Sequence, residues 1–359
     1  MKIYIPSDLK RNIKSKELFL LVQPFFSKSG WKLNLNSLNK WNFDYSKIML
    51  VDEIEKAEVF LIPFTINYYF KNNFKKYLEK YNKICQKQNI LAFGFVSGDF
   101  AYSFPEYKTI TYFRMSGFRS RLGDNNKGFP AALTDRHHLY YHENDPIVLN
   151  KKETPIVGFC GHATDSKIEF SKQTIKYLKE NFKRFFSNYQ FNIYEKLFQS
   201  AYVRYKLLKK IENDKKIKTN FIYRKKYRAG AKNKIDLDSS TLEYYKNIKE
   251  SDYTLCIRGT GNFSIRLYET LMMGRIPIFI NTDCLLPFSK TIDWKKHVIF
   301  IEWADISKIN DIIKEFHLNI TNNNFQKIQI KNRELWLNKL SPQGVFKSFE
   351  SIVNLEIKP

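Results

Sequence analysis

The chain has 359 residues, and its 60 Lys and Arg against 36 Asp and Glu give a formal net charge of +24. Hydrophobic residues make up 43% of it, with 31 Phe and 22 Tyr but only 13 Gly and 11 Pro. This composition excludes a disordered, collagen-like or linker-like chain and is sufficient for two domains with hydrophobic cores.

The first half alternates short apolar runs with a longer amphipathic stretch, a pattern typical of parallel α/β structure. We expect a helix at about 68–87 and strands at 2–6, 59–63, 91–96 and 109–113. Polar residues gather around 142–145, and Pro146 and Pro155 then bracket a linker. We therefore predict a first domain over residues 1–150.

The second half repeats the alternation and predicts a second domain over residues 151–340. Its expected strands are 155–161, 253–257, 276–280 and 298–301, and its expected helices are 166–186, 239–249 and 264–273. Thirteen Lys and Arg against two acids mark residues 204–234 as a basic loop region. Residues 341–359 are expected to form a C-terminal helix that packs back on the first domain. The order favours an α/β fold of two Rossmann-like domains that face each other across a cleft.

The cysteines and the charge indicate a compartment and a class of partner. The four Cys form no C-x-x-C pair, which fits a reducing cytoplasm. We find neither a signal-peptide h-region nor an apolar run of the roughly 18–20 residues that a membrane span needs. We expect a cytoplasmic protein, at most peripheral on the inner face of the membrane. The excess of positive charge predicts an anionic partner: nucleic acid, an anionic bilayer, a nucleotide diphosphate or an acidic glycan.

One segment carries most of the functional information, residues 253–278. A buried strand is followed by Gly259 and Gly261, and a helix is expected to begin near Ser264, a good N-cap residue. A helix N-terminus behind a glycine turn favours phosphate, and Arg266 can fork onto phosphate oxygens. Glu269 lies three residues further on the same helix face, where a carboxylate can accept both hydroxyls of a ribose. Together these residue types predict a site for a nucleotide diphosphate.

The same residues resemble the signature of exostosin-like glycosyltransferases, glycosyltransferase family 47. The family's Ser-x-Arg-x-x-Glu and Gly-x-Ile-Pro appear as Ser264 to Glu269 and Gly274 to Pro277. Its Asp-x-x-x-Pro-Phe and Ile-Asp-Trp are similar to residues 283–288 and 292–294, and its Ala-Asp-x-Phe-x-x-Pro-Phe strand to residues 57–64.

The resemblance implies a GT-B fold, with the nucleotide-sugar donor on the second domain and the acceptor on the first. It also implies inversion at the anomeric carbon, no bound metal and no other cofactor, with UDP as the first expectation for the nucleotide and GDP as the second. The acceptor would be a growing surface polysaccharide or a lipid-linked glycan. The triplet Asp236-Leu-Asp238 precedes a predicted helix, so we interpret it as a turn and N-cap and not as a metal motif.

Two groups of candidate site residues follow. The expected donor-binding residues are Arg258, Gly259, Gly261, Asn262, Ser264, Arg266 and Glu269, with Arg224 and Arg228 from the basic loop. The catalytic base must come from the first domain, where Asp99 follows a predicted strand at its carboxyl end. Asp135 and His137 are its rivals, and no motif decides between the three.

Two other functional classes stay open at this point. The basic segment with interleaved Tyr fits a nucleic-acid-binding protein, although no RNP, KH, zinc-finger or basic-helix signature is found. A non-catalytic relative of the glycosyltransferases, acting as a partner of a polymerase, would carry the same motifs. We favour a transferase with no nucleic-acid partner.

Overall fold

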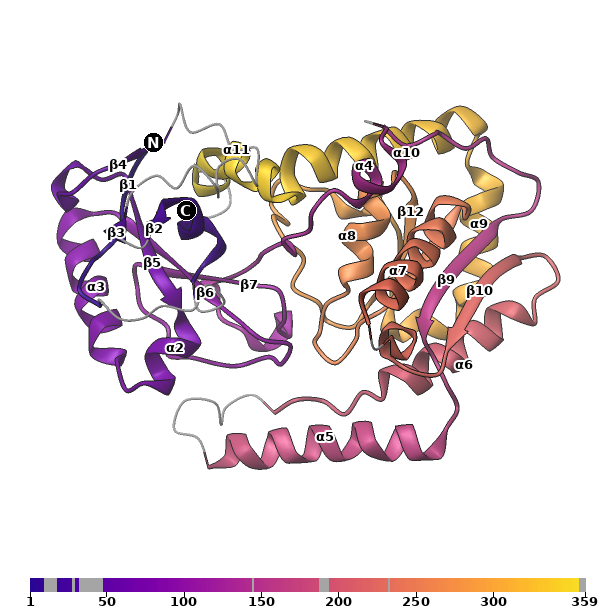
Figure 1. Ribbon diagram of the computed structural model, residues 1–359, viewed down its shortest axis with the longest axis horizontal. Helices are drawn as coiled ribbons and strands as arrows, with labels where there is room; N and C mark the ends of the chain where they lie inside the picture. Colours follow the sequence, from indigo (N-terminus) through magenta and orange to yellow (C-terminus); the bar gives the residue numbers. More distant parts are fainter. Residues whose placement is uncertain are drawn as a thin grey trace.

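The computed structural model describes residues 1–9, 18–27, 30–31, 48–143, 145–186, 194–231 and 233–354. Figure 1 shows two α/β bodies, one at each side of the view. A long helix, α5 (Lys167–Phe185), lies below them, and the C-terminal helices lie above them.

The first body is built on a parallel sheet in the order β4-β1-β5-β6-β7-β8. Its strands are β1 (Lys2–Tyr4), β4 (Met49–Leu50), β5 (Val59–Thr65), β6 (Leu91–Val96), β7 (Ile110–Arg114) and β8 (Asn126–Gly128). Every residue of β5 and β7 is buried, as apolar runs in the middle of a parallel sheet require. Pro63 has no N–H to give to the ladder, and the pairing of β5 with β6 shifts between Leu61 and Thr65.

The predicted helix over 68–87 is two helices, α2 (Ile66–Lys71) and α3 (Lys75–Gln88). The break lies at Asn73, whose φ of 58° is left-handed and ends helical geometry there. A small antiparallel pair, β2 (Phe26–Ser27) and β3 (Gly30–Trp31), completes the described strands of this body.

The second body contains a parallel sheet in the order β10-β9-β11-β12-β13. Its strands are β9 (Ile156–His162), β10 (Lys218–Arg224), β11 (Tyr253–Cys256), β12 (Ile276–Asn281) and β13 (Ile299–Glu302). Its helices besides α5 are α6 (Ser200–Glu212), α7 (Lys234–Lys249), α8 (Ile265–Met272), α9 (Ile309–Asn319) and α10 (Asn322–Leu335).

Two expectations for this body are wrong. The basic segment 204–234 is not a loop: it contains most of α6 and all of the edge strand β10. Helix α7 begins at Lys234, so Asp236 lies inside its first turn, and Asn233 is the N-cap that accepts the Asp236 N–H at 2.8 Å.

The chain passes between the bodies more than once. It leaves the first sheet after Gly128, and the short helix α4 (Arg136–Tyr141) already contacts α7 of the second body. The predicted boundary at residue 150 lies between α4 and β9. At the other end of the chain, α11 (Pro342–Ile352) returns to the first sheet after the π-helical turn Trp336–Leu340.

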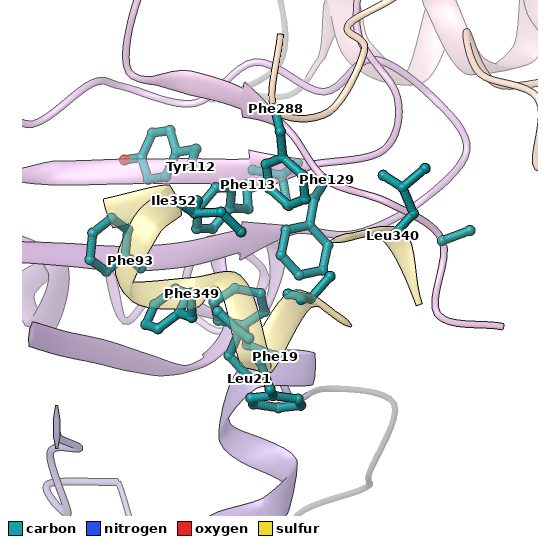
Figure 2. Packing of buried hydrophobic residues seen from close by; sticks show 14 of the residues in the cluster. Phe19, Leu21, Phe93, Tyr112, Phe113, Phe129, Phe288, Leu340, Phe349 and Ile352 are labelled. Atoms are coloured by element: carbon teal, nitrogen blue, oxygen red, sulfur yellow. The ribbon is translucent and has the colours of Figure 1, made fainter. Parts of the chain in front are cut away.

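The returning helix shares one hydrophobic core with the first sheet. Phe349 of α11 meets Phe93 of β6 with ring centroids 5.8 Å apart. Phe288, from the loop after β12, reaches Phe129 of the first body at 6.3 Å. Figure 2 shows these rings gathered around the sheet, with Leu340 and Ile352 beside them. The burial of such apolar surface is the main stabilising contribution to this junction.

The two sheets face each other with the carboxyl ends of their strands. Asn262, after β11, donates through its side-chain amide to the Gly117 carbonyl at 2.9 Å, and Ser120 donates to Asp283, after β12, at 2.6 Å. Gly117 and Ser120 follow β7 of the first body. Two parallel α/β domains that meet in this way, with a C-terminal helix returning to the first, form the GT-B fold. Among the described residues, no helix is long and apolar enough to cross a membrane.

Candidate functional site

The topology of the second sheet selects one edge for a ligand. From β9 the chain moves outward to β10 on one side, and then to β11 on the other side of β9. This reversal is a topological switch point, and ligands of open α/β sheets bind outside the carboxyl ends of the strands at such a point. The segments concerned are the end of β9 at His162 and the loop after β11, residues 257–264.

The loop after β11, which we call the glycine loop (residues 257–264), is held firmly against the first domain. Asn262 is fully buried, and besides Gly117 its amide donates to the Asp283 carbonyl at 2.8 Å. A Cβ on Gly261 would lie 2.2 Å from the Asp99 carbonyl oxygen, whereas a Cβ on Gly259 would meet nothing nearer than 3.5 Å. Only Gly261 is therefore required by close packing.

Arg258 is a structural residue of this loop. It is buried and donates to Glu195 at 3.2 Å and to the Thr260 carbonyl at 2.9 Å. The Glu195 carboxylate is itself fully buried and also pairs with Arg184 of α5 at 3.3 Å. Two buried cations thus share one buried anion, an arrangement that fixes the glycine loop to α5. A direct role of Arg258 in ligand binding would require this pairing to break.

Arg266 lies across the end of β9. Its guanidinium donates to the Cys160 carbonyl at 2.9 Å and stacks on the Phe159 ring at 4.0 Å. This approach is possible because residue 161 is glycine: a Cβ there would be 2.7 Å from Arg266 Nη2. Burial disfavours its charge, but Tyr244, Cys256 and Glu269 favour it more strongly, and the pKa of Arg266 is raised. A permanent positive charge is therefore held at the switch point.

Glu269 follows one turn later on α8 and is half-buried. One carboxylate oxygen accepts the Tyr244 hydroxyl at 2.5 Å and the other accepts the Tyr245 hydroxyl at 3.0 Å. Burial raises the pKa of Glu269, although both tyrosines and Arg266 act in the opposite direction. Each oxygen has a second lone pair, so the carboxylate retains acceptors for two further hydroxyl groups.

Two residues at this point were not predicted from the sequence. Arg204 of α6 donates to the Arg258 carbonyl at 3.0 Å, and its Nη2 lies 3.5 Å from the Cβ position of Gly259. His162 ends β9 and is half-buried; burial, together with the charge of Arg204, lowers its pKa. Arg204 lies 42 positions after His162 and 54 positions before Arg258, so only the folded structure shows that these residues lie side by side.

The remaining predicted donor residues are Arg224, Arg228 and Ser264, and each has a different environment. Arg224 pairs with His162 in the β9–β10 register, but its guanidinium donates to Glu243 at 2.7 Å and to the Ser240 carbonyl at 2.6 Å. Arg228 belongs to the short 3-10 turn Tyr227–Gly230, and its side chain lies outside the described residues. Ser264 occupies the N-cap position of α8, yet its hydroxyl makes no capping hydrogen bond.

The three candidate bases lie at different places. Asp99 is exposed and follows β6, and its backbone contacts Gly261 of the glycine loop. Asp135 caps α4 and forms a two-pronged ion pair with Arg333 of α10, at 2.7 and 3.2 Å. His137 is fully buried in α4. The fold brings Asp99 to the glycine loop and does not bring Asp135 or His137 there, since α4 packs at the opposite end of α8, against Met272.

A cavity of about 560 Å³ opens beyond the ends of β12 and β13. It is lined by residues 283–286 and 289–295, which include the family-like Asp283 and the Ile-Asp-Trp residues 292–294, and by Arg119 of the first domain. Arg266 and Glu269 do not line it. Among the described residues, no three His, Cys, Asp or Glu side chains lie close enough together to hold a metal ion.

The Exostosin GT47 domain matches residues 174–316, which include α5, the glycine loop and α8. Over this range, which is less than half of the chain, the sequence is similar to the Exostosin GT47 domain. The matched range contains Arg204, Arg258, Arg266 and Glu269, whereas Asp99 and His162 lie outside it.

Curated relatives match a short stretch of this chain. A probable glucuronosyltransferase of Oryza sativa subsp. japonica is 34% identical over 70 residues, 20% of this chain and 17% of the relative. The probable beta-1,4-xylosyltransferase IRX10 of Arabidopsis thaliana is 32% identical over 70 residues, again 20% of this chain and 17% of the relative. The match thus spans about a sixth of the length of these relatives.

Two solved structures are similar at low scores. TarM has a TM-score of 0.36 at 13% identity, over 91% of this chain and 59% of TarM. HepE of Anabaena, solved with UDP and glucose, has a TM-score of 0.34 at 8% identity, over 98% of this chain and 99% of HepE.

Proposed function

We propose that this chain is a glycosyltransferase that moves a sugar from a nucleotide-diphosphate sugar, with UDP as the first choice of nucleotide and GDP as the second. The acceptor is a hydroxyl group of a growing surface polysaccharide or of a lipid-linked glycan. The observation that carries the proposal is the position of Arg266 and Glu269: both lie in the range that matches the GT47 domain, and both lie on α8 beside the switch point of the second sheet.

The proposed donor site assigns a task to each neighbouring group. Arg266, Arg204 and the start of α8 supply positive charge for a diphosphate, and Glu269 accepts the ribose hydroxyls through its unused lone pairs. The relatives named as probable glucuronosyl- and xylosyltransferases support a sugar donor of this general class.

The proposed reaction is a single displacement that inverts the anomeric carbon. The acceptor oxygen forms a bond to that carbon while the bond from the carbon to the diphosphate oxygen breaks. The acceptor proton passes to the Asp99 carboxylate, and the electron pair of the broken bond leaves with the nucleoside diphosphate. Arg266 and Arg204 stabilise the charge that develops on this leaving group, so the proposal requires no metal ion.

We place the reaction in the cytoplasm. All four cysteines are buried and unpaired, which supports a reducing compartment.

Turnover of a panel of UDP- and GDP-sugars, with glycan and lipid-linked acceptors, tests the proposal. Wild type should release one nucleoside diphosphate in an acceptor-dependent way. Asp99→Asn should lower kcat by about 10²–10⁴-fold and leave nucleotide affinity unchanged. Asp52→Asn, which removes an exposed carboxylate of the same domain, is the matched control.

Full activity of Asp99→Asn would reject that residue as the base. No turnover, together with a steeply salt-dependent affinity for nucleic acid, would favour the nucleic-acid-binding alternative instead. Binding of nucleotide without turnover by any acceptor would favour a non-catalytic partner of a polymerase.

A further inference from the structure

Helix α5 is attached to the protein by one face only. Its buried residues are Tyr177 and Arg184; the Tyr177 hydroxyl donates to the Thr260 carbonyl of the glycine loop at 2.9 Å, and Arg184 donates to the Ala101 carbonyl of the first domain at 3.2 Å. Asn181 and Glu195 exchange two hydrogen bonds of 2.8 and 2.9 Å. The inner face is therefore fixed to both domains.

The opposite face of α5 is apolar and exposed. Large hydrophobic side chains recur along it at spacings of three, four and seven residues, which place them on one stripe of a helix. Its members, with their exposed fractions, are Ile168 (70%), Ile175 (49%), Leu178 (54%), Phe182 (68%) and Phe185 (66%), and Phe186 (68%) follows at the C-cap. At 1.5 Å per residue the stripe is about 25 Å long, and contiguous exposed apolar surface of this kind marks an interaction site.

A row of lysines borders this stripe. Lys172, Lys176, Lys179 and Lys183 are exposed and follow the same spacing on the neighbouring line of the helix. The two acids of α5 are turned to its other side: Glu180 pairs with Arg184 at 3.1 Å, and Glu169 accepts the Gln173 amide at 2.9 Å. The outward face of α5 thus combines apolar side chains with positive charge and contains no exposed acid.

We infer that the outward face of α5 is a docking surface for an anionic phospholipid bilayer. An apolar stripe beside a row of lysines is the arrangement by which a helix lies in the plane of a membrane, with its apolar side chains at the acyl boundary and its ammonium groups at the anionic head groups. The row of lysines specifies the occupant, because an apolar protein partner requires no such row. The overall charge of +24 acts in the same direction.

Docking in this way brings the glycine loop close to the lipid. Lys176 of the lysine row donates to the Thr260 hydroxyl at 3.1 Å, and Tyr177 holds the Thr260 carbonyl. Thr260 lies between Gly259 and Gly261. The helix that rests on the bilayer is therefore in direct contact with the candidate donor site, which suits a lipid-linked acceptor. The inference about the bilayer itself does not depend on the proposed catalytic activity.

Vesicle flotation tests the inference, with phosphatidylcholine vesicles and with vesicles that also contain phosphatidylglycerol. Wild type should bind the anionic vesicles and bind the neutral ones far more weakly. The triple variant Lys172→Gln, Lys179→Gln, Lys183→Gln should bind about 100-fold more weakly, since each lysine near such a surface is worth about fivefold. The double variant Leu178→Ser, Phe182→Ser should lose binding even at low salt.

Matched controls separate the helix from the overall charge. Lys71→Gln, Lys83→Gln and Lys87→Gln together remove the same charge from exposed positions of α2 and α3, and this variant should bind nearly as wild type does. The α5 variants should keep the circular dichroism spectrum and the urea-unfolding midpoint of wild type, which excludes misfolding.

Three results would overturn the inference. The first is wild type that binds neither type of vesicle. The second is a control triple variant that loses as much affinity as the α5 triple variant. The third is a wild-type dimer that becomes monomeric in the Leu178→Ser, Phe182→Ser variant without any vesicle binding, which would make α5 an interface between copies of this chain.

Discussion

Two glycines of the same loop should respond in opposite ways to the addition of one methyl group. In Gly261→Ala the new Cβ would lie 2.2 Å from the Asp99 carbonyl oxygen and 2.5 Å from Cε1 of Phe263. A carbon and an oxygen in contact require about 1 Å more, and a backbone carbonyl cannot rotate away as a side chain can. We expect a loss of about 1–3 kcal/mol in the free energy of unfolding, the usual cost of overpacking a filled site.

Gly259→Ala is the internal control. Its Cβ would meet only Arg204 Nη2, at 3.5 Å, an ordinary contact. The φ of neither glycine lies in the left-handed region, so alanine is tolerated by the backbone at both positions. Reduced freedom of the unfolded chain should make Gly259→Ala neutral or more stable by about 0.4–1 kcal/mol.

Urea unfolding followed by circular dichroism measures both effects, and the two midpoints should move apart. Gly261→Ala should also lower kcat/KM, because the loop must withdraw from Asp99. Equal unfolding free energies for the two variants, within about 0.5 kcal/mol, would refute the close approach of the two domains at Gly261.

Two further predictions concern buried charge. Glu195→Ala leaves Arg184 and Arg258 buried without their shared anion, so it should lower the free energy of unfolding in urea by about 3–5 kcal/mol. Glu58→Ala, at an exposed carboxylate, should lower it by under about 1 kcal/mol. Similar small losses for both variants would contradict a stabilising role of the buried ion pairs of Glu195. Burial lowers the pKa of His137 below its ordinary 6.5, so the unfolded chain takes up a proton first as the pH falls. The free energy of unfolding should therefore decline as the pH falls from about 6.5 through the lowered pKa, and it should decline less steeply in His137→Leu than in wild type. If the free energies of unfolding of the two proteins have the same pH dependence, His137 does not titrate in this way.

The sequence predicted the local structure of the site well and its tertiary contacts poorly. The strand, glycine turn and helix over 253–273 follow from an apolar run, two glycines and a periodic stretch, and the structure contains β11, the glycine loop and α8 there. The edge strand β10 was missed because most of its residues are only half-buried and lysines surround it, so no alternation of apolar and polar residues is visible.

The partners of the arginines could not be read from the sequence. Arg266 finds the Cys160 carbonyl 106 positions away, and Arg258 finds Glu195 63 positions away. Arg266 near the start of a predicted helix and Arg258 at a strand end beside the glycines were both predicted to lie near a phosphate, but only the fold shows that Arg258 forms a buried ion pair. Asp135 was a candidate base for its residue type alone, and its pairing with Arg333, 198 positions away, gives it a structural task.

Calorimetric titration of UDP and GDP tests whether Arg266 and Glu269 of α8 form a nucleotide site. Wild type should bind one of the two at micromolar concentration. Glu269→Ala should bind it about tenfold or more weakly, equivalent to about 1.4 kcal/mol, whereas Glu250→Ala, which removes an exposed carboxylate of the same domain, should bind as wild type does. Equal affinity of Glu269→Ala and wild type, or no binding of either nucleotide by wild type, would contradict the account.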